Sequence, residues 1–119
     1  MIVLAKLSLA LLCFGADVSD YQCYPMLYGN STPIGEFDMN LRLTASKGYG
    51  GDVIQFLDTD HVVLAIHRLW LLNPEQHRDT RINSDNPRHH IITNGCINIM
   101  PLVYDKLKDC CINQKLVIE

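Results

Sequence analysis

The sequence predicts a mainly β fold, a sandwich or barrel that contains one short helix. Three observations support this prediction: several short apolar or alternating segments, turns rich in glycine and proline between them, and a single helix-like segment late in the chain. The chain has 119 residues, of which 48% are hydrophobic and 19% are charged, as expected for one modest globular core. We therefore expect a single domain over residues 1–119.

The first segment allows two interpretations. Residues 2–14 are almost entirely apolar, and Lys6 is followed by ten uncharged residues that end at Ala16. This pattern fits the charged and apolar regions of a secretory signal, and it is too short to span a bilayer. It also fits a strand or hairpin of the domain itself, whose loss would leave a small core. Residues 1–16 are thus either a signal peptide or the first strand.

Two strands joined by a turn are expected next. Residues 21–28 are rich in aromatic and apolar side chains, and the Gly29–Pro33 segment has the composition of a turn. Residues 36–44 then alternate polar and apolar side chains, which is the period of a half-buried strand. Three glycines within residues 47–51 end this strand.

The middle of the chain contains two further strands and a polar insert. Residues 53–57 form a short predicted strand, and residues 62–66 are apolar throughout, as in a strand buried on both faces. His67 stands at the end of that second strand. Residues 73–90 are polar and rich in arginine and histidine, so we expect a long loop or a short helix with flanking loops, and such inserts often serve as lids.

A helix and a final strand complete the predicted fold. Pro101 suits the first turn of a helix, and Leu102, Val103 and Leu107 form an apolar stripe along it. This helix would direct the positive end of its dipole toward the preceding cysteine, Cys96. Residues 114–119 have the alternation of a last strand.

The charge argues against a nucleic-acid partner. Thirteen acidic and ten basic residues give a formal net charge of −3, so the chain lacks the overall positive field that dominates binding to phosphate backbones.

Five cysteines form an odd set without the paired spacing of a zinc or redox motif. At least one thiol should therefore remain free. Cys110 and Cys111 are adjacent and are not expected to bond to each other. Any bridge from either of them would have to reach Cys13 or Cys23.

Cys96 and His67 are the candidate catalytic residues. A cysteine attacks as its thiolate, so it needs a base, N–H groups to hold an oxyanion, and partial exposure. Gly95 lets the backbone turn tightly beside Cys96. His67 is the best available base, because a rigid strand fixes its ring. The alternative is that Cys96 is a buried structural thiol.

The other histidines carry less chemical information. His77, His89 and His90 lie in the polar insert and are expected to be solvated. A zinc site made from His89, His90 and Cys96 has no support in their spacing.

Four ordered motifs resemble the YkuD-type L,D-transpeptidases, which cross-link bacterial peptidoglycan or attach groups to it. The Thr93–Asn98 segment, TNGCIN, is similar to the family's [S/T]-x-G-C-x-N signature, and AIHRLW at residues 65–70 resembles its histidine motif in the subgroup with His-Arg-x-Trp. GNSTPIGEF at residues 29–37 and GYGG at residues 48–51 match its corner and a turn near the substrate. The resemblance implies a YkuD-like β-sandwich or barrel with one short helix after the cysteine.

The resemblance also implies a mechanism without metal or cofactor. Cys96 would attack a carbonyl of a peptidoglycan stem tetrapeptide, release the terminal D-alanine and form a thioester, while His67 acts as general base. Backbone N–H groups of Asn94, Gly95 and Cys96 would form the oxyanion hole. The backbone carbonyl of Arg68 would orient the His67 ring. The expected partners are a donor stem peptide and an amine acceptor, in the periplasm or cell envelope.

Substrate contacts are expected from Arg68, Trp70, Tyr49, Thr93 and Asn98. Many family members have histidine where this chain has Asn94 and arginine where it has Asn98, so substrate carboxylates need another cation. Arg68, or Arg81 or Arg88 of the insert, can pair with a carboxylate in a bidentate fork. Arg68 could equally form a salt bridge that shapes its loop. The alternative to a substrate contact is a packing role for Trp70 and a surface role for Tyr49.

Two other classes compete with this enzyme. A non-catalytic envelope module of the same fold would bind peptidoglycan or a partner protein, with Cys96 either idle or disulfide-bonded. A papain-like hydrolase fits less well, because its nucleophile precedes its histidine in the chain, whereas His67 comes before Cys96. The sequence does not predict the acceptor, which could be a stem peptide, water, a free D-amino acid or a protein lysine.

Overall fold

The computed structural model describes residues 1–119 and contains one nine-stranded, curled sheet. The strand order is β4-β9-β1-β2-β3-β8-β7-β6-β5. The strands are β1 Ile2–Lys6, β2 Leu11–Phe14, β3 Gln22–Leu27, β4 Gly35–Phe37, β5 Asn40–Leu43, β6 Asp52–Asp58, β7 Val63–Arg68, β8 Ile97–Ile99 and β9 Lys115–Ile118. The helices are α1 Arg78–Arg81 and α2 Pro101–Cys110, with 3-10 turns η1 Leu7–Leu9, η2 Pro74–Gln76 and η3 Pro87–His90.

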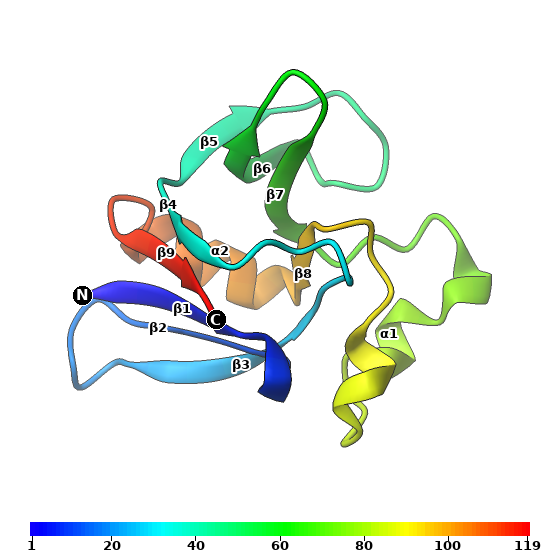
Figure 1. Cartoon of the computed structure of the whole chain (residues 1–119), viewed down its shortest axis with the longest axis horizontal. Helices are drawn as coiled ribbons and strands as arrows, with labels where there is room; N and C mark the ends of the chain where they lie inside the picture. The colour runs from blue at the N-terminus through cyan, green and yellow to red at the C-terminus, as the bar shows by residue number, and fades with distance from the viewer.

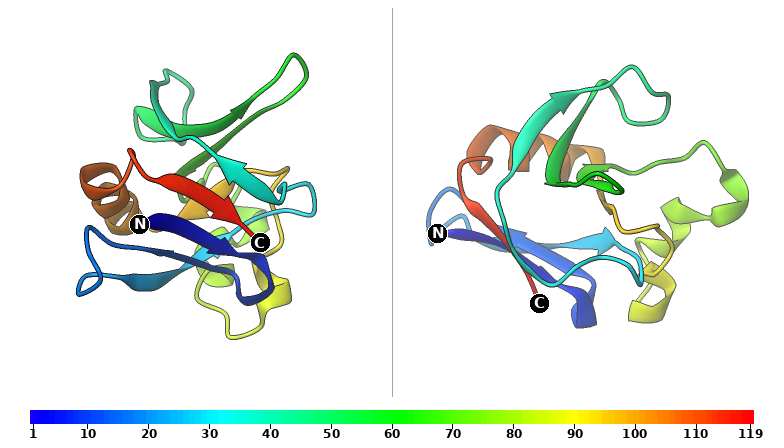
Figure 2. Two further views of the ribbon diagram at one scale, coloured as in Figure 1. Left: turned by 60° about the vertical axis from the view of Figure 1, so that its left-hand side comes forward. Right: turned by 45° about the horizontal axis from the view of Figure 1, so that its top comes forward.

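Two lobes of the sheet face each other across the core. Strands β1, β2 and β3 form one lobe, strands β5, β6 and β7 form the other, and α2 packs between them (Figures 1 and 2). Nineteen buried residues from both lobes make one core cluster, to which α2 contributes Tyr104 and Leu107, both 0% exposed. The prediction of a mainly β fold with a helix after Cys96 is confirmed. None of the helices is long and apolar enough to cross a membrane.

Two pairs of neighbouring strands are parallel, β1 with β9 and β7 with β8. The other neighbours in the sheet are antiparallel. A parallel pair needs a long connection, because the chain has to return to the end at which the first strand began. The polar insert at residues 73–90 is part of the connection between β7 and β8, so its ends lie close to the catalytic candidates.

The predicted strand at residues 36–44 is two strands on opposite edges of the sheet. β4 pairs with β9, whereas β5 pairs with β6. Met39 lies between them and is 5% exposed, while Leu43 on β5 is 86% exposed. The expectation of one half-buried strand was wrong because alternation reports a period of two and does not identify the partner strand. The curl of the sheet brings both edges within reach of this short segment.

The N-terminal residues form the hairpin of β1 and β2. β1 lies between β9 and β2, and Val3, Ala5 and Leu12 are 0% exposed. Removal of residues 1–15 would therefore take two central strands out of the sheet. Within this structure, the segment is part of the core.

The insert is folded onto the body of the domain. Ile82, 1% exposed, packs with Leu27 and Leu69 in a small second cluster. His90 is 4% exposed, and its ring nitrogens lie 2.9 Å from the carbonyl oxygen of Met26 and 2.8 Å from that of Ser84. The expectation that His90 is a solvated loop residue was wrong, because η3 turns its ring inward. His77 and His89 are exposed, as expected.

Four cysteines form two disulfides and leave Cys96 free. Cys13 and Cys23 are register partners on β2 and β3, with a Cα–Cα distance of 3.9 Å. Cys110 and Cys111 are bonded to each other, contrary to our expectation. The chain leaves α2 at Cys111, with φ −136° and ψ 10°, and this change of direction allows the two neighbouring side chains to meet.

Candidate active site

The parallel strands β7 and β8 bring His67 and Cys96 to one end of the sheet. His67 is the register partner of Asn98, so the two side chains share a face. Cys96 lies two residues before Asn98 and therefore points to the same face. The N–H of Ala65 donates to Cys96 Sγ at 3.5 Å, which fixes the sulfur beside β7.

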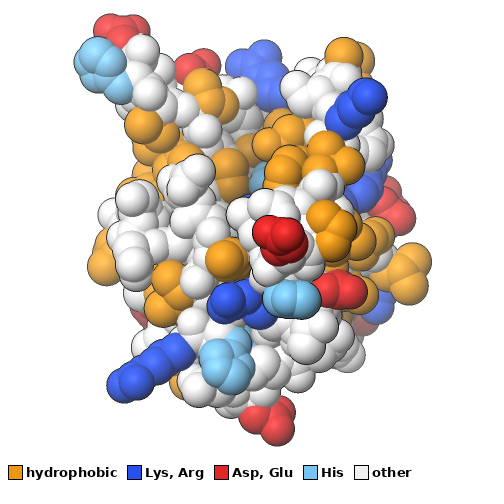
Figure 3. All heavy atoms as spheres, turned by 90° about the vertical axis from the view of Figure 1, so that its right-hand side faces the viewer, with side chains coloured by type: hydrophobic (Ala, Val, Ile, Leu, Met, Phe, Trp, Pro, Cys, Tyr) orange, Lys and Arg blue, Asp and Glu red, His pale blue; other side chains and the backbone are white.

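A cavity of about 270 Å³ lies over the sulfur and the imidazole. Its lining residues are Tyr49, His67, Trp70, Gln76, Arg78, Thr93, Asn94 and Cys96. The cavity lies on the side of the molecule that carries the insert. Figure 3 shows that cationic, acidic, histidine and hydrophobic side chains are interspersed on this side, without a large patch of one sign.

His67 is held as a neutral base. Its side chain is 3% exposed, and burial lowers its pKa to about 4. Nδ1 lies 2.7 Å from the carbonyl oxygen of Arg68, so Nδ1 carries the proton and donates it to that oxygen. Nε2 then keeps its lone pair and can accept a proton, and the His67 side chain belongs to the lining of the cavity. The backbone contact implied by the family resemblance is present.

Asn98 connects His67 to the insert. Its side chain is 0% exposed, and its Oδ1 accepts hydrogen bonds from the N–H of Trp70 at 3.2 Å and from Arg78 at 2.9 Å. These two donors fix the orientation of the amide, so its NH₂ group faces His67 Nε2 at 3.4 Å. Asn98 therefore lies beneath the cavity and positions the residues that line it.

Cys96 rests as a thiol. Burial raises the pKa of Cys96 above its ordinary value, although the N–H of Ala65 and the charge of Arg78 act in the opposite direction. No hydrogen bond joins Sγ to the imidazole of His67. The resting pair is thus a neutral thiol and a neutral imidazole. A thiolate has to form during the attack, by transfer of the proton to a base.

The loop that carries Cys96 is held by threonine hydroxyl groups. Thr93 Oγ1 donates to the carbonyl oxygen of Cys96 at 2.6 Å and accepts from the N–H of Gly95 at 3.1 Å. Thr32 Oγ1 donates to the carbonyl oxygen of Gly95 and accepts from the N–H of Gly29, both at 3.0 Å. The corner that contains Thr32 is therefore a support of the nucleophile loop.

Two glycines allow this close packing. A Cβ atom on Gly29 would lie 2.0 Å from the carbonyl oxygen of Thr93, which no side chain can tolerate without movement of the backbone. Gly95 has φ +128°, and a Cβ atom there would lie 2.8 Å from Leu64. The turn before Cys96 is thus specific for glycine.

The N–H groups of the nucleophile loop divide into two kinds. The N–H of Gly95 is engaged with Thr93 Oγ1. The N–H groups of Asn94 and Cys96 make no intramolecular hydrogen bond. Two of the three donors assigned to the oxyanion hole are therefore free to bind an oxygen.

Arg68 lies outside the cavity and belongs to a network of charges. Asp52 accepts hydrogen bonds from Arg68 at 2.9 Å, Tyr104 at 2.8 Å and Lys108 at 3.2 Å. Burial alone would raise the pKa of Asp52, but these donors outweigh it and the pKa is lower than its ordinary value. The Arg68 guanidinium also lies 4.1 Å from the centre of the Tyr104 ring. It is already paired with Asp52 and does not line the cavity.

Arg68 instead positions Tyr49. Its guanidinium donates to the carbonyl oxygen of Tyr49 at 3.0 Å, and the Tyr49 ring packs edge-on against His67 with ring centres 4.7 Å apart. Gly48 permits this turn, because a Cβ atom there would lie 2.5 Å from the indole nitrogen of Trp70. Tyr49 and Trp70 thus form part of the cavity wall.

Arg78 is the cation that sequence reasoning missed. It is the first residue of α1, it lines the cavity, and its guanidinium lies 5.1 Å from the centre of the Trp70 ring. Arg81, in contrast, donates to backbone carbonyl oxygens of the insert, and Arg88 is exposed. Nothing in the spacing of these arginines distinguishes them. The only signal in the sequence was that Asn98 replaces a cation.

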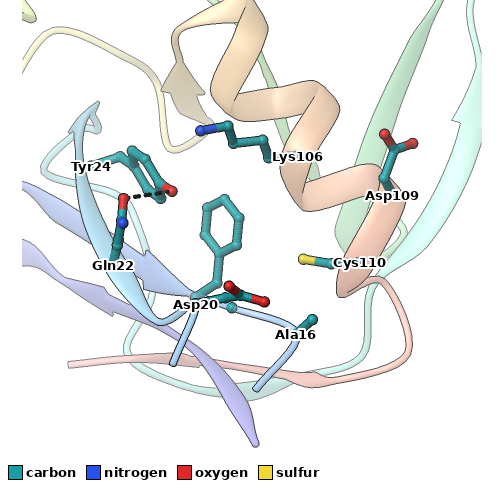
Figure 4. Close-up of a pocket in the computed structure, with 9 residues that line it drawn as sticks. Ala16, Asp20, Gln22, Tyr24, Lys106, Asp109 and Cys110 are labelled. Carbon is teal, nitrogen blue, oxygen red and sulfur yellow. Dashed lines mark hydrogen bonds between the residues drawn. The ribbon is translucent and has the colours of Figure 1, made fainter. Parts of the chain in front are cut away.

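A larger hollow at the other end of α2 has no catalytic pair. Lys106, Asp109 and Cys110 of α2 border it on one side, and Tyr24 and Gln22 of β3 on the other (Figure 4). Cys110 is bonded to Cys111, and no histidine lines the hollow. Nor do any three His, Cys, Asp or Glu side chains of the protein group together as a metal site. The cavity over Cys96 is therefore the candidate active site.

Comparison with protein-family models and with curated proteins finds no match. Solved structures do match. An L,D-transpeptidase from Xylanimonas cellulosilytica, residues 123–326, is 15% identical with a TM-score of 0.60, over 99% of this chain and 59% of that one. An L,D-transpeptidase from Mycobacterium smegmatis is 15% identical with a TM-score of 0.59, and the match covers 99% of this chain and 58% of that one. An LD transpeptidase in complex with imipenem is 16% identical with a TM-score of 0.62, and the match covers 99% of this chain and 58% of that one.

These similarities concern the fold, because the identities are low. The chain spans less than two thirds of the length of the structures that it matches. Nearly the whole of this chain is nevertheless aligned, including both lobes and the parallel pair that carries His67 and Cys96. The protein therefore has the mainly β, curled-sheet fold of L,D-transpeptidase catalytic domains.

Proposed function

We propose that the protein is a cysteine L,D-transpeptidase that acts on peptidoglycan stem peptides. The observation that carries this proposal is the shared cavity of Cys96, the only free thiol, and His67, a buried neutral base. The fold of solved L,D-transpeptidases supports it. The motifs in Thr93–Asn98 and residues 65–70 support it independently, because they come from the sequence.

The first half of the reaction forms a thioester. Sγ of Cys96 attacks the carbonyl carbon of the third residue of a donor tetrapeptide, and the thiol proton passes to His67 Nε2. The tetrahedral oxyanion is held by the free N–H groups of Asn94 and Cys96. The C–N bond then breaks, and the imidazolium returns its proton to the nitrogen of the departing D-alanine.

The second half transfers the acyl group. An acceptor amine attacks the thioester carbon and loses its proton to His67 Nε2, which is neutral again after the first half. The C–S bond breaks, and the proton on the imidazolium returns to the sulfur. Water in place of the amine would give a carboxypeptidase. The pKa of His67, about 4, keeps Nε2 unprotonated at neutral pH.

We place the reaction in the periplasm or cell envelope, where the substrate is found. Two disulfides fit an oxidising compartment of this kind.

Release of D-alanine from a stem tetrapeptide tests the proposal. The wild type should release it, and Cys96→Ala should not. His67→Gln should be slower by about 10²–10⁴-fold, since it lacks the base. His61→Gln is the matched control, because His61 is exposed in the turn between β6 and β7 and does not line the cavity. Peptide binding without turnover in the wild type would favour the non-catalytic envelope module.

A further inference from the structure

Arg78 is a half-buried cation without an acidic partner. No ion pair of the protein includes it. Its Nε donates to Gln76 Oε1 at 2.8 Å, and one terminal nitrogen donates to Asn98 Oδ1 at 2.9 Å. A guanidinium has five N–H donors, so three of them have no protein acceptor. A cation in this state attracts an anion, and a carboxylate fits its planar fork best.

The guanidinium is fixed in place before any ligand binds. Gln76 and Asn98 hold it at two atoms, and the Trp70 ring lies beneath it at 5.1 Å. Ile82 anchors α1 in the second apolar cluster. A cation that is already oriented loses little conformational freedom on binding, so its contribution to recognition is large.

Asn98 places this cation next to the reacting groups. Its Oδ1 contacts Arg78 while its NH₂ group contacts His67 Nε2, so a single amide separates the guanidinium from the base. Arg78 and Cys96 also line the same cavity. The next residue of a peptide lies about 3.8 Å along the chain, Cα to Cα. A carboxylate bound by Arg78 would thus lie in the same cavity as the attacked carbonyl, and the short spacing between residues allows it to belong to the leaving residue.

We infer that Arg78 makes the site specific for donors whose leaving residue ends in a free α-carboxylate. This inference rests on the proposed function and names the residue of this chain that recognises the leaving group. Arg68 cannot perform this role, because it is paired with Asp52. Arg78 is a substrate-binding residue that the insert supplies to the cavity.

A pair of donor peptides tests the substrate class. The wild type should form the Cys96 acyl-enzyme at least about tenfold faster with a tetrapeptide acid than with the same peptide as its C-terminal amide, a preference worth about 1.4 kcal/mol. Arg78→Gln should bring the ratio close to one, and Arg78→Lys should give an intermediate ratio, since it keeps the charge without the fork. Arg88→Gln, an exposed arginine of the same insert, should keep the wild-type ratio.

A second pair of reagents tests the cation without any natural donor. Iodoacetate and iodoacetamide both alkylate a thiolate with loss of iodide, and Cys96 is the only free thiol. Relative to a small free thiol, Cys96 should react several-fold faster with iodoacetate than with iodoacetamide, and Arg78→Gln should abolish this preference. Arg88→Gln should retain it.

The outcomes separate the two proposals. If peptide acids and amides react equally well in the wild type, or if the preference survives in Arg78→Gln, the inference about Arg78 is overturned while the transpeptidase proposal stands. If no tetrapeptide reacts but the iodoacetate preference depends on Arg78, the transpeptidase proposal fails and Arg78 remains a carboxylate-binding residue. If no tetrapeptide reacts and the iodoacetate preference does not depend on Arg78, both proposals are overturned.

Discussion

Asn98 is the residue on which the candidate site depends most. It is completely buried, and each end of its amide has a separate partner: Trp70 and Arg78 at the oxygen, and His67 at the nitrogen. A carboxylate or an alkyl side chain cannot make both kinds of contact. The amide therefore orients a base and a cation at the same time, although it does not line the cavity itself.

Asn98→Ala should disturb both functions of this amide. The buried N–H of Trp70 loses its acceptor, so we expect the free energy of unfolding to fall by about 1–3 kcal/mol. The preference for a peptide acid should fall as well, because Arg78 loses one of its two hydrogen bonds. Urea unfolding and the donor pair measure the two effects. Asn83→Ala, at an exposed asparagine of the insert, should change stability by less than about 0.5 kcal/mol.

His67 should make stability depend on pH in a defined range. Its pKa is 6.5 in a model compound and about 4 in the folded protein, so the unfolded chain takes up the proton first as the pH falls. The stabilising effect of the neutral ring is complete above pH 6.5 and is lost toward pH 4, by about 3 kcal/mol in total. Urea unfolding at both pH values should show this extra loss in the wild type compared with His67→Gln. Equal losses in the two proteins would contradict the burial of a neutral ring.

Individual residues were predicted with uneven success. The sequence indicated Cys96 and His67 because a glycine turn and the end of a buried strand are local features, and the structure places both on one cavity, while their catalytic roles stay a prediction. The partner of Arg68 could not, since Asp52 and Tyr104 come from other elements. The position of Arg78 depends on contacts with Trp70 and Asn98, which are 8 and 20 residues away along the chain. Hydrogen bonds at such separations leave no periodic pattern.

At the scale of elements, the nucleophile loop is supported by the corner around Thr32. Two segments far apart in the sequence meet there, and the meeting requires a glycine at position 29 because the carbonyl oxygen of Thr93 occupies the place of a side chain. The hydroxyl of Thr32 then joins the two backbones. The corner and the loop that carries Cys96 are therefore one structural unit.

Gly29→Ala should damage this unit severely. The new methyl group would displace the Thr93 backbone, so we expect a loss of several kcal/mol in stability or a reaction of Cys96 with iodoacetamide that is changed by more than about tenfold. Gly51→Ala is the matched control, because a Cβ atom there meets nothing within 4 Å. Its only cost comes from the backbone angle, because φ is +103°, and a residue other than glycine loses roughly 1–2 kcal/mol of stability there. Equal effects of both substitutions would show that the close approach at Gly29 is unimportant.

The elements were predicted well where burial alone decides them. The strands near residues 21–28, 53–57, 62–66 and 114–119 and the helix at Pro101 all form. The division of residues 36–44 into β4 and β5 was missed, since only the curl of the sheet explains it. The effect of the α2 dipole on Cys96 stays a prediction; β8 lies between Cys96 and the start of α2 in the chain.

At the scale of the whole molecule, the N-terminal hairpin and the Cys13–Cys23 disulfide hold one lobe together. β1 and β2 contribute several completely buried side chains, and the Cys13–Cys23 bond joins β2 to β3. Sequence alone could not decide between a leader and a strand pair for residues 1–16, because both need a short apolar run. Pairing with β9, from the opposite end of the chain, accounts for the apolar residues of β1.

The two disulfides should contribute unequally to stability. Cys13–Cys23 closes a loop with a sequence separation of 10, so the double variant Cys13→Ala, Cys23→Ala should lose about 2–3 kcal/mol. Cys110–Cys111 closes no loop and hardly restricts the unfolded chain. Reduction of the double variant with dithiothreitol should therefore shift its urea midpoint very little. A large further shift would show that the Cys110–Cys111 bond stabilises the fold by other means.

The central claim is that Cys96 forms an acyl-enzyme with a peptidoglycan stem peptide. The most direct measurement is the intact mass of the protein after brief incubation with a tetrapeptide donor. We predict one adduct with the mass of the acyl tripeptide, absent in Cys96→Ala and formed more slowly in His67→Gln. An unchanged mass of the wild type with tetrapeptide donors, or an adduct that persists in Cys96→Ala, would contradict it.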